Sequence, residues 1–318
     1  MTTHEKKTFF ATYDWAKSWK DLPWAHDEPT LFLSEICRLR KPGRALDIGC
    51  GAGTDSVYLA SQGWDVTSLD FMPKALAYTA QRAAEKGVKI RPVEADITEW
   101  VPDRQYDLVL DHGLLHNMDP VRYPAYRATV MKALASDGEF VLLHWHPRFP
   151  GQGNGKMGPT RVDREQIQAF FAPELQERFF AREEFEDLPD MVGGGMSQAY
   201  YWFRPNLAWQ RPAELLEQVR STLKSHGIAA DGTAPPIAAE LLARVVGPGR
   251  LGISHRNPAA AETRSILAQW CEKARVEAAD AARLLNLFAS DQGGKICVAG
   301  APRCDNCAVR FCKRLRYR

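Results

Sequence analysis

The sequence predicts an α/β protein in which a mostly parallel β-sheet is followed by a smaller helical module. Between residues 45 and 145, short apolar segments typical of buried strands alternate with longer segments of helical periodicity. Alternation of this kind builds a parallel sheet with right-handed crossovers and helices on both faces. The first apolar segment ends in Gly49, Gly51 and Gly53. A ligand is therefore expected at the carboxyl ends of the strands.

The predicted elements follow one another in a regular order. Strands are expected over 45–49, 65–69, 89–94, 106–110 and 139–145, and helices over 29–40, 54–62, 73–87 and 121–135. A helix near 163–171 and strands near 177–185 and 197–204 complete the sheet. The last strand ends at Pro205, so residues 1–205 are predicted to form the first domain.

The glycine-rich stretch predicts a nucleotide cradle. Glycine lets the backbone take a positive φ and approach a ligand closely, and the N–H groups at a helix start can hold polar groups of a cofactor. The spacing Asp47-x-Gly49-x-Gly51-x-Gly53 differs from the dinucleotide fingerprint, in which the last glycine follows three residues after the second. The lysine of a phosphate-binding loop is missing as well.

This stretch resembles the first motif of class I S-adenosylmethionine-dependent methyltransferases, and later strand ends match the same family in order. The resemblance implies a Rossmann-like sheet with an antiparallel last strand, and S-adenosylmethionine as cofactor. It implies that Asp70 accepts the ribose hydroxyls and that Asp96 lies beside the adenine amino group. The cofactor-binding residues it implies are Asp47, Gly49, Cys50, Gly51, Gly53, Asp70, Phe71, Asp96, Ile97 and Asp111.

The loop after the fourth strand carries the candidate catalytic residues Asp111, His112 and His116. Methyl transfer from a sulfonium is an in-line displacement, so the enzyme aligns the acceptor and removes its proton where it has one. The pattern Asp-x-Gly-x-x-His resembles the loop that borders the pocket in small-molecule methyltransferases related to thiopurine methyltransferase. His112 and His116 are the candidate bases, and for each the alternative is a histidine bonded to the backbone.

Two further histidines, His144 and His146, flank Trp145 at the end of the fifth strand. One of them could reach the same pocket. As a metal pair they lack a third ligand nearby in the sequence.

Aromatic residues are concentrated ahead of the first strand, between residues 8 and 27. They are Phe9, Phe10, Tyr13, Trp15, Trp19 and Trp24. One interpretation is that they pack on the domain. The other is a lid over the cofactor, because Trp-x-x-x-Trp followed by Leu22-Pro23-Trp24 is similar to the N-terminal segment of thiopurine and thiol methyltransferases.

Two motifs typical of enzymes that methylate DNA bases are absent, which argues against a base as the methyl acceptor. Methyltransferases of exocyclic base nitrogens carry an Asn/Asp-Pro-Pro-aromatic loop after the fourth strand, and C5-cytosine enzymes carry a Pro-Cys nucleophile there. This loop has neither. A small diffusible acceptor is therefore expected, methylated at S, O or N.

Composition predicts a cytoplasmic protein. The first residues lack the apolar core of a signal peptide, and no stretch is apolar enough to span a membrane. In a reducing compartment, the seven cysteines favour metal ligands over disulfides.

Residues 206–318 are predicted to form a helical module that ends in a metal loop. Helices are expected over 207–226, 236–247, 259–275 and 277–290. The spacing Cys297-x6-Cys304-x2-Cys307-x4-Cys312 resembles the iron–sulfur loop of helix-hairpin-helix DNA glycosylases such as endonuclease III, which has x5 in the last gap. The predicted ligand is a 4Fe-4S cluster or a zinc ion.

The similarity extends weakly to residues 244–256, but Ala239 and Glu240 stand where the catalytic aspartate of that family would be. Glycosylase activity is therefore not expected. From residue 303 onward there are six basic residues and one acidic residue, although the whole chain carries a net charge of +2. The alternative function is therefore a nucleic-acid-directed protein, in which this basic module binds DNA or RNA.

Overall fold

The computed structural model describes residues 3–154, 159–185, 195–230, 259–289, 296–297 and 307–309. The chain divides into two compact units, one of Met1–Ile167 with Glu177–Arg204 and one of Gln168–Gln176 with Pro205–Arg318. The predicted domain boundary after residue 205 stays a prediction. Among the residues described, no helix combines the length and the apolar character needed to cross a membrane.

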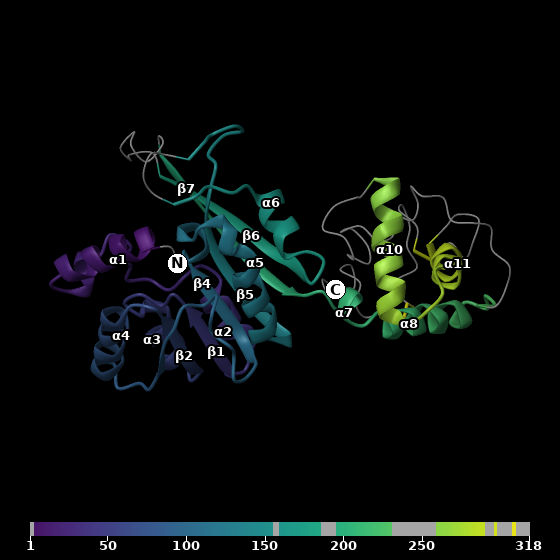
Figure 1. Ribbon diagram of the computed structural model, residues 1–318. Coiled ribbons are helices and arrows are strands. Elements are labelled where there is room, and N and C mark those ends of the chain that lie inside the picture. Colours follow the sequence, from purple (N-terminus) through teal and green to yellow (C-terminus); the bar gives the residue numbers. More distant parts are fainter. Residues whose placement is uncertain are drawn as a thin grey trace. The chain divides into compact units, whose positions relative to one another are not determined.

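Within these residues the strands form a seven-stranded sheet of order β3-β2-β1-β4-β5-β7-β6 (Figure 1). The strands are β1 (Arg44–Ile48), β2 (Asp65–Asp70), β3 (Arg91–Glu94), β4 (Tyr106–His112), β5 (Leu134–His146), β6 (Leu175–Phe185) and β7 (Met196–Pro205). Strands β1 to β5 pair in parallel, and β7 pairs antiparallel with β5. The predicted sheet, mostly parallel with an antiparallel last strand, is confirmed.

Four helices connect strands, as the alternation predicted: α3 (Thr54–Ser61), α4 (Pro73–Glu85), α5 (Tyr123–Ala133) and α6 (Arg164–Phe171). Two more, α1 (Thr3–Trp15) and α2 (Leu33–Leu39), precede β1, and α1 was not predicted from the sequence. The helix expected from residue 29 begins only at Leu33, because Phe32 takes a φ of 77°, which lies outside the helical region. Thr30 therefore lies in irregular chain, and its backbone N–H is available to a side chain.

The register of the sheet decides which polar side chains share a face. Asp47 of β1 lies beside Leu110 of β4. Side chains alternate between the two faces along a strand, so His112 shares a face with Leu110 and with Asp47, while Asp111 points to the opposite face. The face of Leu110 is covered by α2 and α3, through Leu33, Ile36 and Leu59.

The second unit is helical where it is described. Its helices are α7 (Leu207–Gln210), α8 (Pro212–Ser225), α10 (Ala260–Ala274) and α11 (Ala278–Ala289). The helix predicted over 207–226 is interrupted at Arg211, because Pro212 disfavours a helical conformation of the residue before it. Trp270 is fully buried in the core of this unit and donates from Nε1 to the carbonyl oxygen of Ala208 at 2.8 Å. The helix predicted over 236–247 and the segment 244–256 lie outside the described residues.

Candidate functional site

The glycine-rich loop between β1 and α3 has the conformation that its sequence predicted. Gly49, Gly51 and Gly53 all have positive φ, from 54° to 76°. At Gly53 a side chain is also excluded by contact, because a Cβ there would lie 2.4 Å from Cγ2 of Thr79. The backbone N–H groups of Gly49 and Cys50 donate to the carbonyl oxygen of Leu69, which ties this loop to β2.

Asp70 ends β2 and holds two backbone groups beside the loop. Its Oδ2 accepts from the N–H of Gly51 and its Oδ1 from the N–H of Met72, both at 2.9 Å. Burial raises the pKa of Asp70 to about 6, although these hydrogen bonds oppose the shift. Each carboxylate oxygen can accept a second hydrogen bond, so the side chain retains acceptor capacity for a ligand.

Asp47 lies below the loop and is buried with two serines. Ser56 of α3 donates to its Oδ2 at 2.6 Å, and the hydroxyls of Ser56 and Ser68 are 2.6 Å apart. Burial, with the neighbouring carboxylate of Asp55, raises the pKa of Asp47 to about 8. Its contacts are to protein groups that anchor α3 to the sheet.

Asp96 and Ile97 follow β3 at the same edge of the sheet. Oδ1 of Asp96 accepts from the N–H and the hydroxyl of Thr98 and, at 2.9 Å, from Nη2 of Arg122. Ile97 is buried. An acidic and an apolar side chain therefore follow β3, and their contact with an adenine stays a prediction.

The N-terminal aromatic segment packs on the glycine-rich loop and on α4. A Cβ placed on Gly51 would lie 3.7 Å from both the hydroxyl of Tyr13 and Nε1 of Trp24. Lys74 of α4 donates to the carbonyl oxygen of Tyr13 at 2.5 Å. The Arg82 guanidinium lies over the ring of Trp19, 3.7 Å from its centroid.

Two predicted cofactor-binding side chains lie against this region. Phe71 contacts the rings of Phe9 and Phe10 edge-on, with centroids 6.0 and 6.4 Å apart. The Sγ of Cys50 is 3.7 Å from the hydroxyl oxygen of Thr79, and burial raises the pKa of this thiol. Packing of the aromatic segment on the domain is therefore observed, and its function as a lid stays a prediction.

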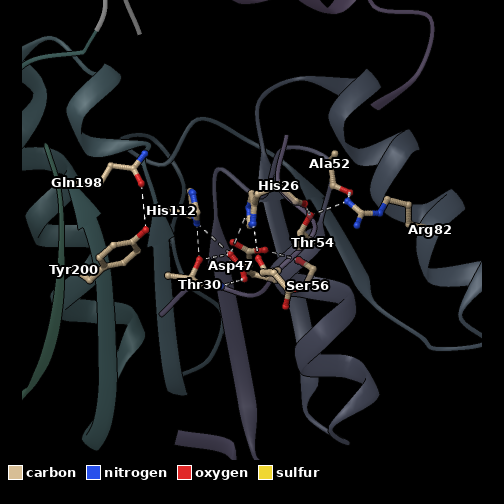
Figure 2. A network of polar contacts seen from close by, with 12 residues as sticks. His26, Thr30, Asp47, Ala52, Thr54, Ser56, Arg82, His112, Gln198 and Tyr200 are labelled. Carbon is tan, nitrogen blue, oxygen red and sulfur yellow. Dashed lines mark hydrogen bonds and ion pairs between the residues drawn. The ribbon is translucent and has the colours of Figure 1, made fainter. Parts of the chain in front are cut away.

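His112, at the end of β4, belongs to a polar network that joins three segments of the chain (Figure 2). Its Nδ1 lies 2.5 Å from Oγ1 of Thr30, which in turn donates to Oδ2 of Asp55 at 2.5 Å. The imidazole of His26 stacks on that of His112, with centroids 4.1 Å apart and ring planes inclined by 12°. The side chain of His112 is 24% exposed, whereas Asp55 is buried.

Asp111 lies on the other face of the sheet and accepts three hydrogen bonds from protein donors. Its carboxylate accepts from the hydroxyl of Tyr126 at 2.6 Å and from the N–H groups of Leu114 and Leu115 at 2.6 and 3.1 Å. Burial raises its pKa to about 6. The structure therefore separates Asp111 from His112, and the contacts of Asp111 fix the loop that follows β4.

His116 is buried beside the same loop. Its Nδ1 accepts from the backbone N–H of Trp145 at 3.2 Å, so its proton is on Nε2 when the ring is neutral. Burial and the nearby His144 lower its pKa well below the usual range. Its ring packs edge-on against His144 at 5.4 Å. These contacts match the alternative of a structural histidine.

Of the four predicted metal-binding cysteines, Cys297 and Cys307 are described. Both are half-buried and pack against the core of the second unit, next to the buried residues Ile296 and Val309. Cys304 and Cys312 lie outside the described residues, as do 298–306 and 310–318, which include most of the basic segment.

Sequence reasoning missed Thr30, Asp55 and His26. Asp55 had a local signal, because it directly follows the glycine-rich loop in the first turn of α3. Thr30 and His26 lie 25 and 29 residues before Asp55, in irregular chain, and no pattern in the sequence links them to it.

The fold and the site define a class of protein: an α/β protein with a mostly parallel sheet and a glycine-rich loop at the carboxyl ends of β1 and β2. A methyltransferase domain family matches residues 45–138. Thiocyanate methyltransferase 1 of Arabidopsis thaliana is 31% identical over 165 residues, which cover 50% of this chain and 71% of that protein. The chain belongs to the class I S-adenosylmethionine-dependent methyltransferases.

Other known proteins are similar to parts of the chain. Thiocyanate methyltransferase 1 of Brassica oleracea is 32% identical over 41% of this chain, and the match spans 60% of that protein's own length. A solved structure of the 1,6-didemethyltoxoflavin-N1-methyltransferase of Burkholderia thailandensis is 23% identical, covers 63% of this chain and 87% of its own, and has a TM-score of 0.47.

Proposed function

We propose that this methyltransferase acts on a small-molecule acceptor that carries a proton on sulfur, oxygen or nitrogen. The observation that carries the proposal is His112, a partly exposed imidazole at the carboxyl end of β4, on the same face of the sheet as Asp47. Thiocyanate methyltransferases and a probable thiol methyltransferase among the relatives support a small acceptor. The acceptor then loses its proton to His112.

The residues around the glycine-rich loop fit S-adenosylmethionine. We propose that Asp70 holds the ribose hydroxyls with its remaining lone pairs, that Gly49, Gly51 and Gly53 form the backbone cradle, and that Asp96 and Ile97 contact the adenine. The side chains of Asp47 and Cys50 hold the backbone of this cradle in place, and Phe71 packs beside it. When bound, this cofactor supplies a methyl group on a positively charged sulfur.

Of the three predicted catalytic residues, we propose that His112 is the base and that Asp111 and His116 position the loop. Every carboxylate contact of Asp111 named above is to a loop or helix donor, and Nδ1 of His116 is occupied by the N–H of Trp145. His112 differs, since no described residue bonds its Nε2.

The test compares acceptors that carry a proton with one that does not. The parent and His112→Gln are assayed with an alkanethiol, which is mostly protonated at neutral pH, and with thiocyanate, which is already an anion. We expect His112→Gln to reduce turnover of the alkanethiol by about 10²-fold or more, while turnover of thiocyanate changes by no more than a few fold. His226→Gln, in the second unit, is the control.

Two outcomes contradict this proposal. Equal losses with both acceptors would mean that His112 aligns the acceptor and is not its base. Binding of S-adenosylmethionine by the parent without methylation of thiols, phenols or amines would remove the proposed acceptor class.

For the second unit, we propose that Cys297, Cys304, Cys307 and Cys312 hold a 4Fe-4S cluster, or else zinc. The support is that the segments of Cys297 and Cys307, ten residues apart in the sequence, both pack against one core. Nucleic-acid binding by the basic segment and a cytoplasmic location stay predictions from the sequence.

A further inference from the structure

The side chains of Thr30, Asp55 and His112, which come from separate segments, contact one another. Thr30 precedes α2, Asp55 lies in the first turn of α3, and His112 ends β4. The backbone N–H of Thr30 donates to Oδ1 of Asp55 at 2.7 Å, and the Thr30 hydroxyl lies 2.5 Å from both Oδ2 of Asp55 and Nδ1 of His112. Figure 2 shows the His112 ring above Thr30, with one nitrogen directed toward it.

The hydrogens of this chain of contacts have one consistent arrangement when Asp55 is ionised. A carboxylate only accepts, so the single hydroxyl proton of Thr30 goes to Asp55. The hydroxyl oxygen of Thr30 must then accept from Nδ1–H of His112. In the neutral ring the lone pair is consequently on Nε2, the nitrogen on the far side of the ring from Thr30.

We infer that Asp55, acting through the hydroxyl of Thr30, is a positioning residue that holds His112 in the Nδ1–H tautomer. This inference rests on the proposed function, in which Nε2 of His112 receives the acceptor's proton. The imidazolium formed in that step keeps its Nδ1–H on Thr30, and the negative charge of Asp55 lies 3.5 Å from Nδ1. Thr30 and Asp55 together therefore stabilise the positive charge that develops on His112.

The surroundings keep Asp55 ionised although it is buried. Burial alone would raise the pKa of Asp55, but its hydrogen bonds with His112 and Thr30, and the positive charge that His112 and His26 carry when protonated, outweigh it and lower the pKa. While His112 is neutral, the backbone N–H and the hydroxyl of Thr30 remain as donors to the carboxylate. The positive end of the α3 dipole acts in the same direction, because Asp55 is in the first turn. The carboxyl of Asp47 also faces Asp55, and its pKa is raised to about 8, so it is mostly neutral when Asp55 is ionised. Other titratable groups near this network are Tyr200, Asp111, His116 and Arg82.

The same side chains could instead be taken for metal ligands, since His26, Asp55 and His112 have donor atoms within 4.8 Å of one another. Ring geometry argues against this. An imidazole nitrogen binds a metal in the plane of its ring, and the two rings are nearly parallel and stacked 4.1 Å apart. The hydroxyl of Thr30 also lies between Nδ1 of His112 and the carboxylate.

The test reads the tautomer directly, by ¹⁵N NMR of the full chain labelled at its eight histidines. The spectrum is recorded at mildly alkaline pH without cofactor, and the His112 signals are assigned by their loss in His112→Gln. We expect Nδ1–H in the parent and in Thr30→Ser, which retains the hydroxyl. We expect a shift of the population toward Nε2–H in Thr30→Val and in Asp55→Asn.

Thr129→Val is the matched control, because the Thr129 hydroxyl is also shielded and donates to the carbonyl oxygen of Ala125 at 3.2 Å, away from His112. It should give the parent's spectrum. A parent with Nε2–H, or a Thr30→Val spectrum that matches the parent, would overturn the inference.

Turnover of an alkanethiol separates this inference from the proposed function. We expect Thr30→Val to lower kcat about tenfold or more with little change in KM for S-adenosylmethionine, and Thr30→Ser to restore most of it. A tautomer that depends on Thr30 with an unchanged kcat would contradict the role of His112 as base. An unchanged tautomer would contradict the positioning role alone.

Discussion

The carboxylate of Asp70 accepts a hydrogen bond from the backbone N–H of Gly51 at 2.9 Å. This contact joins the end of β2 to the glycine-rich loop that follows β1. The residue proposed to hold the ribose therefore also fixes the loop proposed to hold the rest of the cofactor.

Asp70→Asn is expected to weaken S-adenosylmethionine binding at least tenfold. The amide has one acceptor oxygen in place of two, and a charge-assisted hydrogen bond contributes on the order of 1.5–3 kcal/mol. Calorimetric titration measures the affinity. Asp65→Asn, an exposed carboxylate at the start of the same strand, is the control and should bind like the parent. Equal affinities for all three proteins would place the ribose elsewhere.

Gly53→Ala is expected to destabilise the first unit more than Gly87→Ala. Both glycines have positive φ, 76° and 66°, so each alanine costs about 1–2 kcal/mol in backbone strain. At Gly87 no atom lies within 4 Å of the new Cβ, whereas at Gly53 it meets Thr79 at 2.4 Å. We expect Gly53→Ala to cost about 1 kcal/mol or more beyond Gly87→Ala in urea unfolding. Equal losses of unfolding free energy in the two variants would mean that Thr79 and α4 shift to accommodate the new Cβ without an energetic cost.

His144 should make the protein less stable as the pH falls. Burial lowers its pKa from 6.5 to about 4, so below pH 6.5 the unfolded chain binds a proton that the folded chain does not. Stability from this residue is complete above pH 6.5 and falls by up to about 3 kcal/mol as the pH drops toward 4. Denaturant unfolding between these pH values, compared with His144→Asn, isolates the effect.

The comparison with His144→Asn is needed because Asp47, Asp70 and Asp111 act in the opposite direction. Their pKa values are raised, so the folded state binds their protons more readily as the pH falls. The variant should show a shallower loss of stability toward pH 4 than the parent. Parallel pH profiles would mean that His144 gains a proton without cost.

Anaerobically purified protein is expected to be brown, with about four irons per chain and a broad absorption band near 400 nm, if the cysteines bind 4Fe-4S. Zinc has a filled d shell and gives no such band. Cys304→Ser should bleach the colour and leave S-adenosylmethionine affinity unchanged. Cys271→Ser, a buried cysteine of the same unit, is the control and should stay coloured. A colourless parent with one zinc would exclude iron, and a metal-free parent would exclude the site.

The sequence by itself determined the order of strands and helices from β1 to β7 and the conformation of the glycine-rich loop, although it did not predict α1. These features are local: apolar runs between turns specify strands, and glycines at alternate positions specify a backbone of positive φ. Asp70 could be placed at a strand end for the same reason. The period of two along β4 also separates Asp111 from His112, so their opposite faces follow from the sequence once the strand is known to extend to His112.

Only the tertiary structure decided the environment of His112. Thr30 and His112 are 82 residues apart in the chain, and Thr30 and Asp55 are 25 apart, so their contacts depend on how α2, α3 and β4 pack. The left-handed φ of Phe32, which ends the irregular segment of Thr30, was also invisible in a sequence that favours helix from residue 29. Packing against the sheet overrode local propensity there, and it brought a hydroxyl, a buried carboxylate and two imidazoles together.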